Sequence, residues 1–392
     1  MRSQPPPAWL DHDIHLFPLG GITMRNPFVR SLSPLLAVAA AATGGAGIAN
    51  AQTPTPATGA QVVGHVYEAT NSPAGNAIQI FDRLRDGRLR PGSAVATGGL
   101  GLGASLASQN ALVRRGDLLY VVNAGDDTIS TLAITGRGLV KRDVEPTGGD
   151  RPVSVTVHGS TVYVLNQGSE TISGLRVGPD GHLSVLPRST RQLSKAGDAD
   201  PAAAQVSFTP DGRHLLVTHK GDQTIDTFAV HGRYAGSAVP NRSAGSTPYG
   251  FDFDRRGHAI VSEAGPSAVS SYGVRFGRLR TITPSLSDTQ AAACWLVTTR
   301  DGRYAYTVNA ASSTISSYRI GTDGRLSLLA AVAARTTGGG TDAALSPDNK
   351  TLQVRLGNGD IASYAVAHNG NLASLQDTSG TATSGTAGLA TD

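Results

Sequence analysis

Apolar and polar positions along this chain repeat in one pattern: a short apolar segment, a polar turn, and a second apolar segment flanked by Thr or Ser. Three clear copies read LYVVN…TIS, VYVLN…TIS and AYTVN…TIS. Short segments of this kind, bounded by polar turns, are typical of β-strands. The copies span residues 65–80, 119–130, 162–173, 215–226, 259–270, 305–316 and 352–363. The pattern therefore predicts seven repeated units, each rich in strand.

The units are spaced almost evenly. The central apolar residues of the second segments are Ile78, Ile129, Ile172, Ile225, Val269, Ile315 and Ile361, separated by 51, 43, 53, 44, 46 and 46 residues. A repeat of about 40–50 residues built from strands is typical of propeller blades.

Two further tight turns accompany most units. One precedes the first apolar segment, at 115–117, 158–160, 211–213, 256–258, 301–303 and 348–350, and the other follows the second, at 86–87, 180–181, 323–324 and 369–370. Most of these turns contain Asp-Gly, Asn-Gly or a similar pair, which supplies the positive φ that tight hairpins need. Four strands joined by three turns make one antiparallel sheet. We therefore predict an all-β fold, a seven-bladed β-propeller of four-stranded antiparallel blades. A two-sheet sandwich would need far fewer strands, and a solenoid of this period would be helical or would lack two hairpin turns in each repeat.

The first unit lacks an innermost strand, and the end of the chain supplies one. After a linker of Ser, Thr and Gly at 378–386, the short segment 388–390 reads Gly-Leu-Ala. We predict that this tail pairs with the first unit and closes the ring through main-chain hydrogen bonds. The alternative is a frayed tail, which its composition also permits.

The N-terminal region reads as an export signal that follows a short extension. Arg25 and Arg30 precede an apolar run at 35–42, and Ala49-Asn50-Ala51 forms a small-x-small cleavage site. The run is too short to span a bilayer. The expected organisation is an upstream extension at 1–23, which a mis-called start codon would explain, a signal peptide at 24–51, a linker at 52–61 and the propeller at 62–392. We expect an exported protein, periplasmic or extracellular, with no transmembrane anchor.

Composition narrows the function. Glycine, at 48 residues, is abundant, and charged residues make up only 16% of the chain, which favours many tight turns over long helices. Basic residues are scattered singly along the sequence, so we expect no nucleic-acid partner. The single cysteine, Cys294, excludes an intramolecular disulfide and a multi-cysteine metal site. We expect no cofactor, no metal and a monomeric protein.

Side chains that carry chemistry are expected on one face of the ring. The start of each innermost strand and the turn after the second strand share a face, because the two strands run in opposite directions. On that face we select Glu263, Lys220 and Arg151 as candidate catalytic groups, since a carboxylate or an amine in a partly desolvated channel mouth can transfer protons. Candidate ligand-binding residues on the same face are Gln109, Gln205, Tyr249, Trp295 and Asp342. The alternative for each residue is a structural role, in a turn or in packing.

The Asp-Gly-Arg turns and the stretch FTPDGRHLLV at 208–217 resemble the lactonase family of seven-bladed propellers, over essentially all of 62–392. That family includes propeller-type 6-phosphogluconolactonases and carboxymuconate-cyclising enzymes. The resemblance implies opening or closing of a lactone ring on the channel face by His, Glu and Arg side chains. The chain departs from the family pattern at 201–205, where Pro-Ala-Ala-Ala-Gln replaces a Pro-His-x-His-like stretch, and at 219–221, where His-Lys-Gly replaces an Asp-Leu-Gly-like one.

Two functional hypotheses follow. The first is an exported propeller that binds a small lactone or carboxylate on the channel face and opens or closes a lactone ring. The alternative is a catalytically inactive propeller that serves as a binding platform for a ligand or for an envelope protein.

Overall fold

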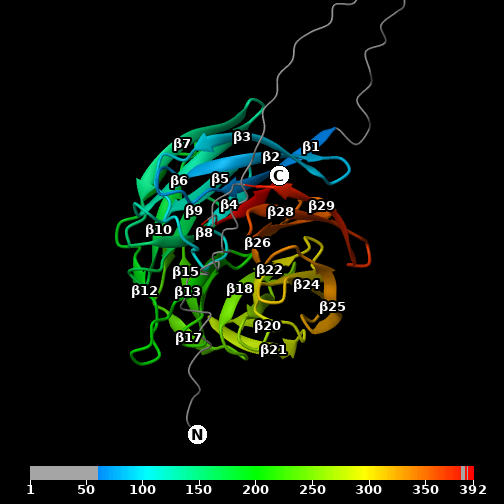
Figure 1. Cartoon of the computed structure of the whole chain (residues 1–392). Coiled ribbons are helices and arrows are strands. Elements are labelled where there is room, and N and C mark those ends of the chain that lie inside the picture. Colours follow the sequence, from blue (N-terminus) through cyan, green and yellow to red (C-terminus); the bar gives the residue numbers. More distant parts are fainter. Residues whose placement is uncertain (1–60, 381–384, 386) are drawn as a thin grey trace, which may run out of the picture. The chain divides into compact units, whose positions relative to one another are not determined.

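The computed structural model describes residues 61–380, 385 and 387–392, so the predicted extension, signal peptide and most of the linker lie outside the described residues. The described part contains strands, turns and bends, and it confirms the all-β prediction. Its strands form seven separate antiparallel sheets that follow one another around a ring (Figure 1). No helix long and apolar enough to cross a bilayer occurs in this part of the chain.

Each sheet is one blade, whose strands are named from the centre of the ring outward. Blade 1 contains β30 (Leu389–Thr391), β1 (Val62–Ala69), β2 (Ala77–Leu84) and β3 (Leu89–Ala96). Blade 2 contains β4 (Leu112–Arg115), β5 (Leu118–Asn123), β6 (Thr128–Thr135) and β7 (Gly138–Pro146). Blade 3 contains β8 (Pro152–His158), β9 (Thr161–Asn166), β10 (Thr171–Val177), β11 (Leu183–Val185) and β12 (Arg191–Gln192). Blade 4 contains β13 (Ala203–Phe208), β14 (His214–His219), β15 (Thr224–His231), β16 (Tyr234–Ala235) and β17 (Val239–Arg242).

The remaining three blades are regular. Blade 5 contains β18 (Pro248–Phe253), β19 (Ala259–Glu263), β20 (Ala268–Arg275) and β21 (Arg278–Ser287). Blade 6 contains β22 (Ala293–Thr298), β23 (Tyr304–Asn309), β24 (Thr314–Ile320) and β25 (Leu326–Arg335). Blade 7 contains β26 (Gly340–Leu345), β27 (Thr351–Leu356), β28 (Asp360–Val366) and β29 (Leu372–Ser379). In blades 3 and 4 the outermost strand is split into two short pieces.

The tail closes the ring as predicted. Strand β30 pairs antiparallel with β1, with Tyr67 opposite Ala390. The side chain of Asp392 reinforces this pairing, because it accepts hydrogen bonds from the Tyr67 hydroxyl at 2.6 Å and from the His65 backbone N–H at 2.5 Å. The two ends of the ring are therefore joined by main-chain and side-chain bonds.

The repeated Asn of the sequence pattern is a buried clamp. Asn166 ends β9, is fully buried, and donates from its side-chain amide to the hydroxyls of Thr171 and Ser173 on the neighbouring strand. Asn123 and Asn309 make the same pair of bonds to the Thr and Ser of their own blades. Each clamp ties the end of a second strand to the start of the third, which explains why the Asn…Thr-Ile-Ser phrase recurs.

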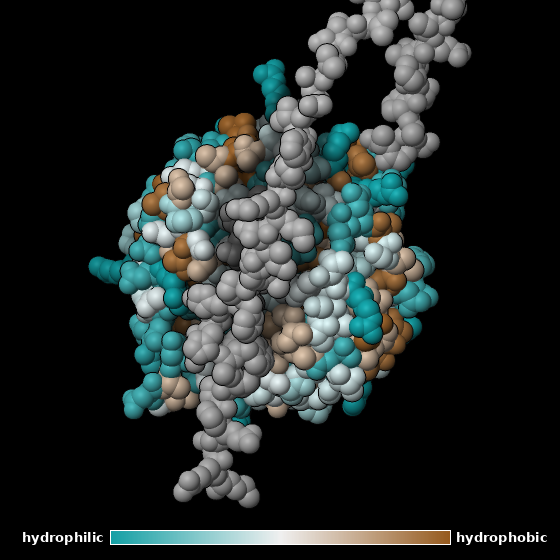
Figure 2. Space-filling view, in the orientation of Figure 1, coloured by the Kyte–Doolittle hydropathy of each residue, from teal (hydrophilic) through white to brown (hydrophobic). Residues whose placement is uncertain are grey.

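The core lies between neighbouring blades. Large side chains such as Tyr163 and Tyr306 are fully buried there. Their hydroxyls donate to the backbone carbonyls of Arg233 and Gly370 in the following blade, which fixes each blade against the next. Outside the area covered by grey atoms, the surface in Figure 2 is mixed, with hydrophobic residues in separate patches.

Candidate functional site

The connection between blades 1 and 2 runs across the central channel. Residues 97–111 join β3 to β4, and Gln109 lies in this connection rather than at the start of a strand. The Gln109 amide bonds both the carbonyl and the N–H of Leu296 in β22, at 2.7 and 3.0 Å, and its backbone N–H donates to Ala204 of β13. Trp295 donates from its indole N–H to the carbonyl of Ser108 at 2.9 Å. Because these contacts reach the innermost strands of blades 4 and 6, the connection fills the channel.

Two other predicted ligand-binding residues also bridge innermost strands. Gln205 in β13 accepts from the N–H of Phe251 at 2.7 Å and donates to its carbonyl at 2.8 Å, so it joins blades 4 and 5. Asp342 in β26 accepts from the N–H of Ala343 at 2.8 Å, and the N–H groups of Gly388 and Leu389 next to it also point to its carboxylate. Burial nevertheless raises the pKa of Asp342 to about 7, because desolvation outweighs these bonds.

Glu263 occupies the clamp position of blade 5. It ends β19, is fully buried, and its Oε1 accepts from the N–H of Gly245 at 2.8 Å and from the Ser270 hydroxyl at 2.5 Å. Ser270 corresponds to the Ser of the Asn clamps in blades 2, 3 and 6. The carboxylate therefore holds the turn of its own blade and the incoming connection.

His219 occupies the same position in blade 4. In its buried imidazole, Nδ1 lies 3.4 Å from a carboxylate oxygen of Asp222, and Nε2 lies 3.3 Å from a carboxylate oxygen of Asp226. The geometry of the second contact does not meet the criteria of a hydrogen bond. Burial alone would lower the pKa of His219, but the two carboxylates outweigh it and raise the pKa to about 9. Blade 4 is therefore held by a charged clamp at the position where blades 2, 3 and 6 use an amide.

Lys220, Arg151 and Tyr249 gather at the mouth of the channel. The ammonium of Lys220 donates to the carbonyl of Ala107, in the connection that fills the channel, at 2.5 Å. It also lies 5.1 Å from the centre of the Tyr249 ring, which in turn packs edge-on against Trp295. Desolvation lowers the pKa of Lys220 to about 8, and the positive charge of Arg151 contributes to this shift. We name Arg151, Lys220 and Tyr249 the rim cluster.

Arg151 is the exposed member of the rim cluster. It has a positive φ of 51°, and its backbone N–H donates to Asp127 at 2.7 Å. Its guanidinium donates to Gln167, whose amide continues to the carbonyl of Ala203. The sequence pattern did not single out Gln167, although it directly follows the clamp Asn of its blade.

Cys294 lies close to the rim cluster but is not set up as a nucleophile. It is buried in β22, and burial raises the pKa of its thiol to about 12. A thiol with this pKa stays protonated at neutral pH.

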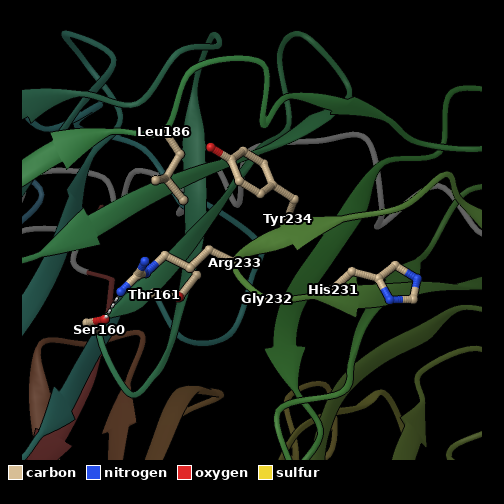
Figure 3. Close-up of a pocket in the computed structure, with 7 residues that line it drawn as sticks. All are labelled: Ser160, Thr161, Leu186, His231, Gly232, Arg233 and Tyr234. Carbon is tan, nitrogen blue, oxygen red and sulfur yellow. Dashed lines mark hydrogen bonds between the residues drawn. The ribbon is translucent and has the colours of Figure 1, made fainter.

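A separate pocket of about 550 Å³ opens on the opposite face, between blades 3 and 4. Figure 3 shows Arg233 pointing to Ser160, to which it donates at 3.3 Å, while Tyr234 and Leu186 line the other side. None of the eight predicted site residues lines it.

Residues 74–191 and 116–268 each match the profile of the family described as lactonase, 7-bladed beta-propeller. The chain belongs to this family. No curated protein matches the sequence.

Solved structures of several bacterial proteins share the fold of this lactonase-family propeller. A candidate 6-phosphogluconolactonase from Bacteroides uniformis aligns with a TM-score of 0.67 and 21% identity, over 83% of this chain and 99% of its own. The periplasmic gluconolactonase of Pseudomonas aeruginosa aligns with a TM-score of 0.64 and 19% identity, over 83% and 98%. A protein from Lactobacillus plantarum gives 0.67 and 20%, over 84% and 99%.

Proposed function

We propose that this propeller is exported and binds a small lactone or its carboxylate product at the rim cluster, where it opens the lactone ring with water. The observation that supports this most directly is the position of the Lys220 ammonium, which lies 5.1 Å from the centre of the Tyr249 ring. Desolvation there lowers the pKa of Lys220 to about 8, and the nearby charge of Arg151 contributes. An amine with this pKa is partly unprotonated near neutral pH and can act as a general base. The similarity to the gluconolactonase of Pseudomonas aeruginosa supports both the substrate class and the compartment.

In the proposed reaction the amine of Lys220 takes a proton from a water molecule as its oxygen attacks the lactone carbonyl. Arg151 stabilises the negative charge that develops on the carbonyl oxygen. The ring C–O bond then breaks, and the leaving ring oxygen takes the proton back from Lys220. The new carboxylic acid gives its remaining proton to water, and the resulting carboxylate lies next to the two cations.

Hydrolysis of a panel of phosphorylated and unphosphorylated aldonolactones by the full chain tests the proposal. Lys220→Ala should lower kcat by about 10²- to 10⁴-fold, because proton transfer is lost. Arg151→Ala should lower kcat/KM by about 10²-fold or more. Lys195→Ala is the matched control, because Lys195 is an exposed lysine on the same face that pairs with Glu170 at 2.5 Å.

Glu263→Gln separates the rim cluster from the clamp. A glutamine can still accept the Gly245 and Ser270 hydrogen bonds, so turnover should be retained. Loss of turnover in Glu263→Gln with normal activity in Lys220→Ala would contradict the proposed site.

The alternative function, a binding platform without catalysis, is favoured by the connection at 97–111, which fills the channel beneath the rim. Binding of an aldonate by the full chain without turnover of any lactone would support it. Loss of that binding in Arg151→Ala would still place the ligand at the rim cluster.

Export is tested separately. After secretion from a bacterial host, the mature N-terminus should be Gln52 by mass spectrometry. Retention of residues 24–51 in the purified protein would contradict the predicted signal peptide.

A further inference from the structure

The two turns of blade 5 on the face opposite the rim cluster carry four exposed arginines. Arg255 and Arg256 lie in the turn between β18 and β19, and Arg275 and Arg278 flank the turn between β20 and β21. None of the four has a carboxylate within 4 Å among the described residues. The acid of these turns, Asp254, is buried and bonds His258 at 2.7 Å instead.

Four turns in other blades pair a cation with a nearby aspartate. Arg213 in blade 4 pairs with Asp211, and Arg325 in blade 6 pairs with Asp323, at 3.9 and 3.1 Å. Arg88 and Lys350 pair with the Asp two positions before them in the same way. The turns of blade 5 therefore present positive charge that these four turns cancel with an aspartate.

Phe276 stands at the tip of the same hairpin and is 88% exposed. It forms a two-residue turn with Gly277, between the paired residues Arg275 and Arg278, and its φ is +52°. Turns of this geometry favour Asn, Asp or Gly, and a bulky residue with positive φ is unusual. The Arg275 guanidinium lies 5.0 Å from the centre of the Phe276 ring. An aromatic ring placed here is unfavourable for the isolated turn, so its advantage is expected to come from a partner.

The corresponding turn of blade 4 also carries an exposed aromatic residue next to an arginine. Tyr234 follows Arg233 there and is 42% exposed (Figure 3). The blade 4 strand before this turn contacts the blade 5 tip, since the Thr227 hydroxyl donates to the carbonyl of Gly277. Among the described residues, Phe276 and Tyr234 are the two large aromatic side chains with high exposure.

We propose that this surface, comprising Arg255, Arg256, Arg275, Phe276, Arg278 and Tyr234, docks the propeller onto a bilayer of anionic phospholipid. Guanidinium groups bind phosphate through paired hydrogen bonds, and the aromatic rings insert at the level of the headgroups. Anionic phospholipid offers both the negative charge and the apolar layer beneath it, whereas an acidic polymer offers the charge alone. The rim cluster on the opposite face would then remain open to solvent.

Co-flotation with vesicles tests the proposal. The full chain should bind vesicles of phosphatidylglycerol and phosphatidylcholine but not vesicles of phosphatidylcholine alone, and 0.5 M KCl should weaken the binding strongly. The triple variant Arg255→Ser/Arg256→Ser/Arg278→Ser should bind about 100-fold more weakly, at about fivefold for each arginine. Arg213→Ser/Arg325→Ser is the matched control on the same face, where both arginines are already paired, and it should bind within about threefold of the wild type. The apolar run at 35–42 is common to all these proteins and cancels in the comparison.

Phe276→Asn separates docking from folding. Asn suits the turn better, so the midpoint of thermal unfolding should stay the same or rise, while vesicle binding falls about tenfold or more. Two results would overturn the proposal: no binding to the anionic vesicles, or binding that is unchanged in both the triple variant and Phe276→Asn. Binding to heparin that depends on the arginines but not on Phe276, without vesicle binding, would point to an acidic polymer instead.

Discussion

Blade 4 can be converted to the amide clamp that blades 2, 3 and 6 use. In blade 3 the clamp pairs Asn166 with Ser173, and the equivalent residues in blade 4 are His219 and Asp226. The double variant His219→Asn/Asp226→Ser therefore replaces a charged clamp by the amide clamp. We expect this variant to fold and to lose the part of the pH dependence of stability that comes from the ionisation of His219.

The size of that dependence follows from the pKa of His219. A rise from 6.5 in the unfolded chain to about 9 in the folded chain corresponds to about 3 kcal/mol at 25 °C. Because the folded value is the higher one, the stabilisation is complete below pH 6.5 and is lost as the pH rises through 9. The contribution should therefore be almost whole at pH 6 and small at pH 9.5.

Urea unfolding at pH 6.0 and 9.5 measures this pH-dependent stabilisation by His219. Relative to the double variant, the wild type should lose about 3 kcal/mol of unfolding free energy between the two conditions. Lys220, whose pKa also lies in this range, is present in both proteins and cancels. The single variant His219→Asn should be the least stable at pH 6, by about 3–5 kcal/mol, because Asp226 stays buried without its cation.

Equal pH dependence in the wild type and the double variant would refute this reasoning. It would mean that the pKa of His219 is the same in the folded and the unfolded protein, so that its contacts with the two aspartates carry no net ionic stabilisation.

Three further predictions concern closure, the channel and the thiol. Asp392→Ala removes the acceptor of the Tyr67 hydroxyl bond across the ring closure and should lower the unfolding free energy by about 1–3 kcal/mol in urea titrations. Gln205→Leu leaves the N–H and carbonyl of Phe251 without partners, so a loss of about 2–4 kcal/mol is expected, and an unchanged midpoint would show that water replaces the amide. Cys294 should react with a thiol reagent at pH 8 only after unfolding, since it is buried and its pKa is about 12; rapid labelling of the native protein would contradict this.

The sequence repeat also carries information on the structural role of two polar residues. Glu263 and His219 stand in the register of Asn123, Asn166 and Asn309, and the structure gives all five a position at the same strand end. A residue that stands at a repeated structural position is expected, first of all, to perform the structural role of that position. The hydrogen bonds of Glu263 agree with this, because its carboxylate accepts a hydrogen bond from Ser270 in its own blade, where the clamp Asn of blades 2, 3 and 6 donates one to the equivalent Ser.

The sequence by itself determined the blades and their closure. Strand alternation and turn chemistry are local, so the spacing of apolar segments and of the Asp-Gly turns was sufficient to predict seven four-stranded sheets. Gly212 and Asn349, for example, have φ values of 70° and 56°, and both have the positive sign that was predicted for these turns. The missing first strand and the apolar tail at 388–390 likewise predicted the pairing of β30 with β1.

Only the tertiary structure decided what fills the channel and where the charge collects. The 51-residue step between the first two units signals an insertion, but its path depends on bonds such as that of Gln109 with Leu296, which is 187 residues away. The arginines look scattered along the chain, yet two turns of blade 5 bring four of them to one surface around Phe276. The contact of Gln109 with Leu296 is set by the packing of one blade against another, and a local pattern carries no record of it.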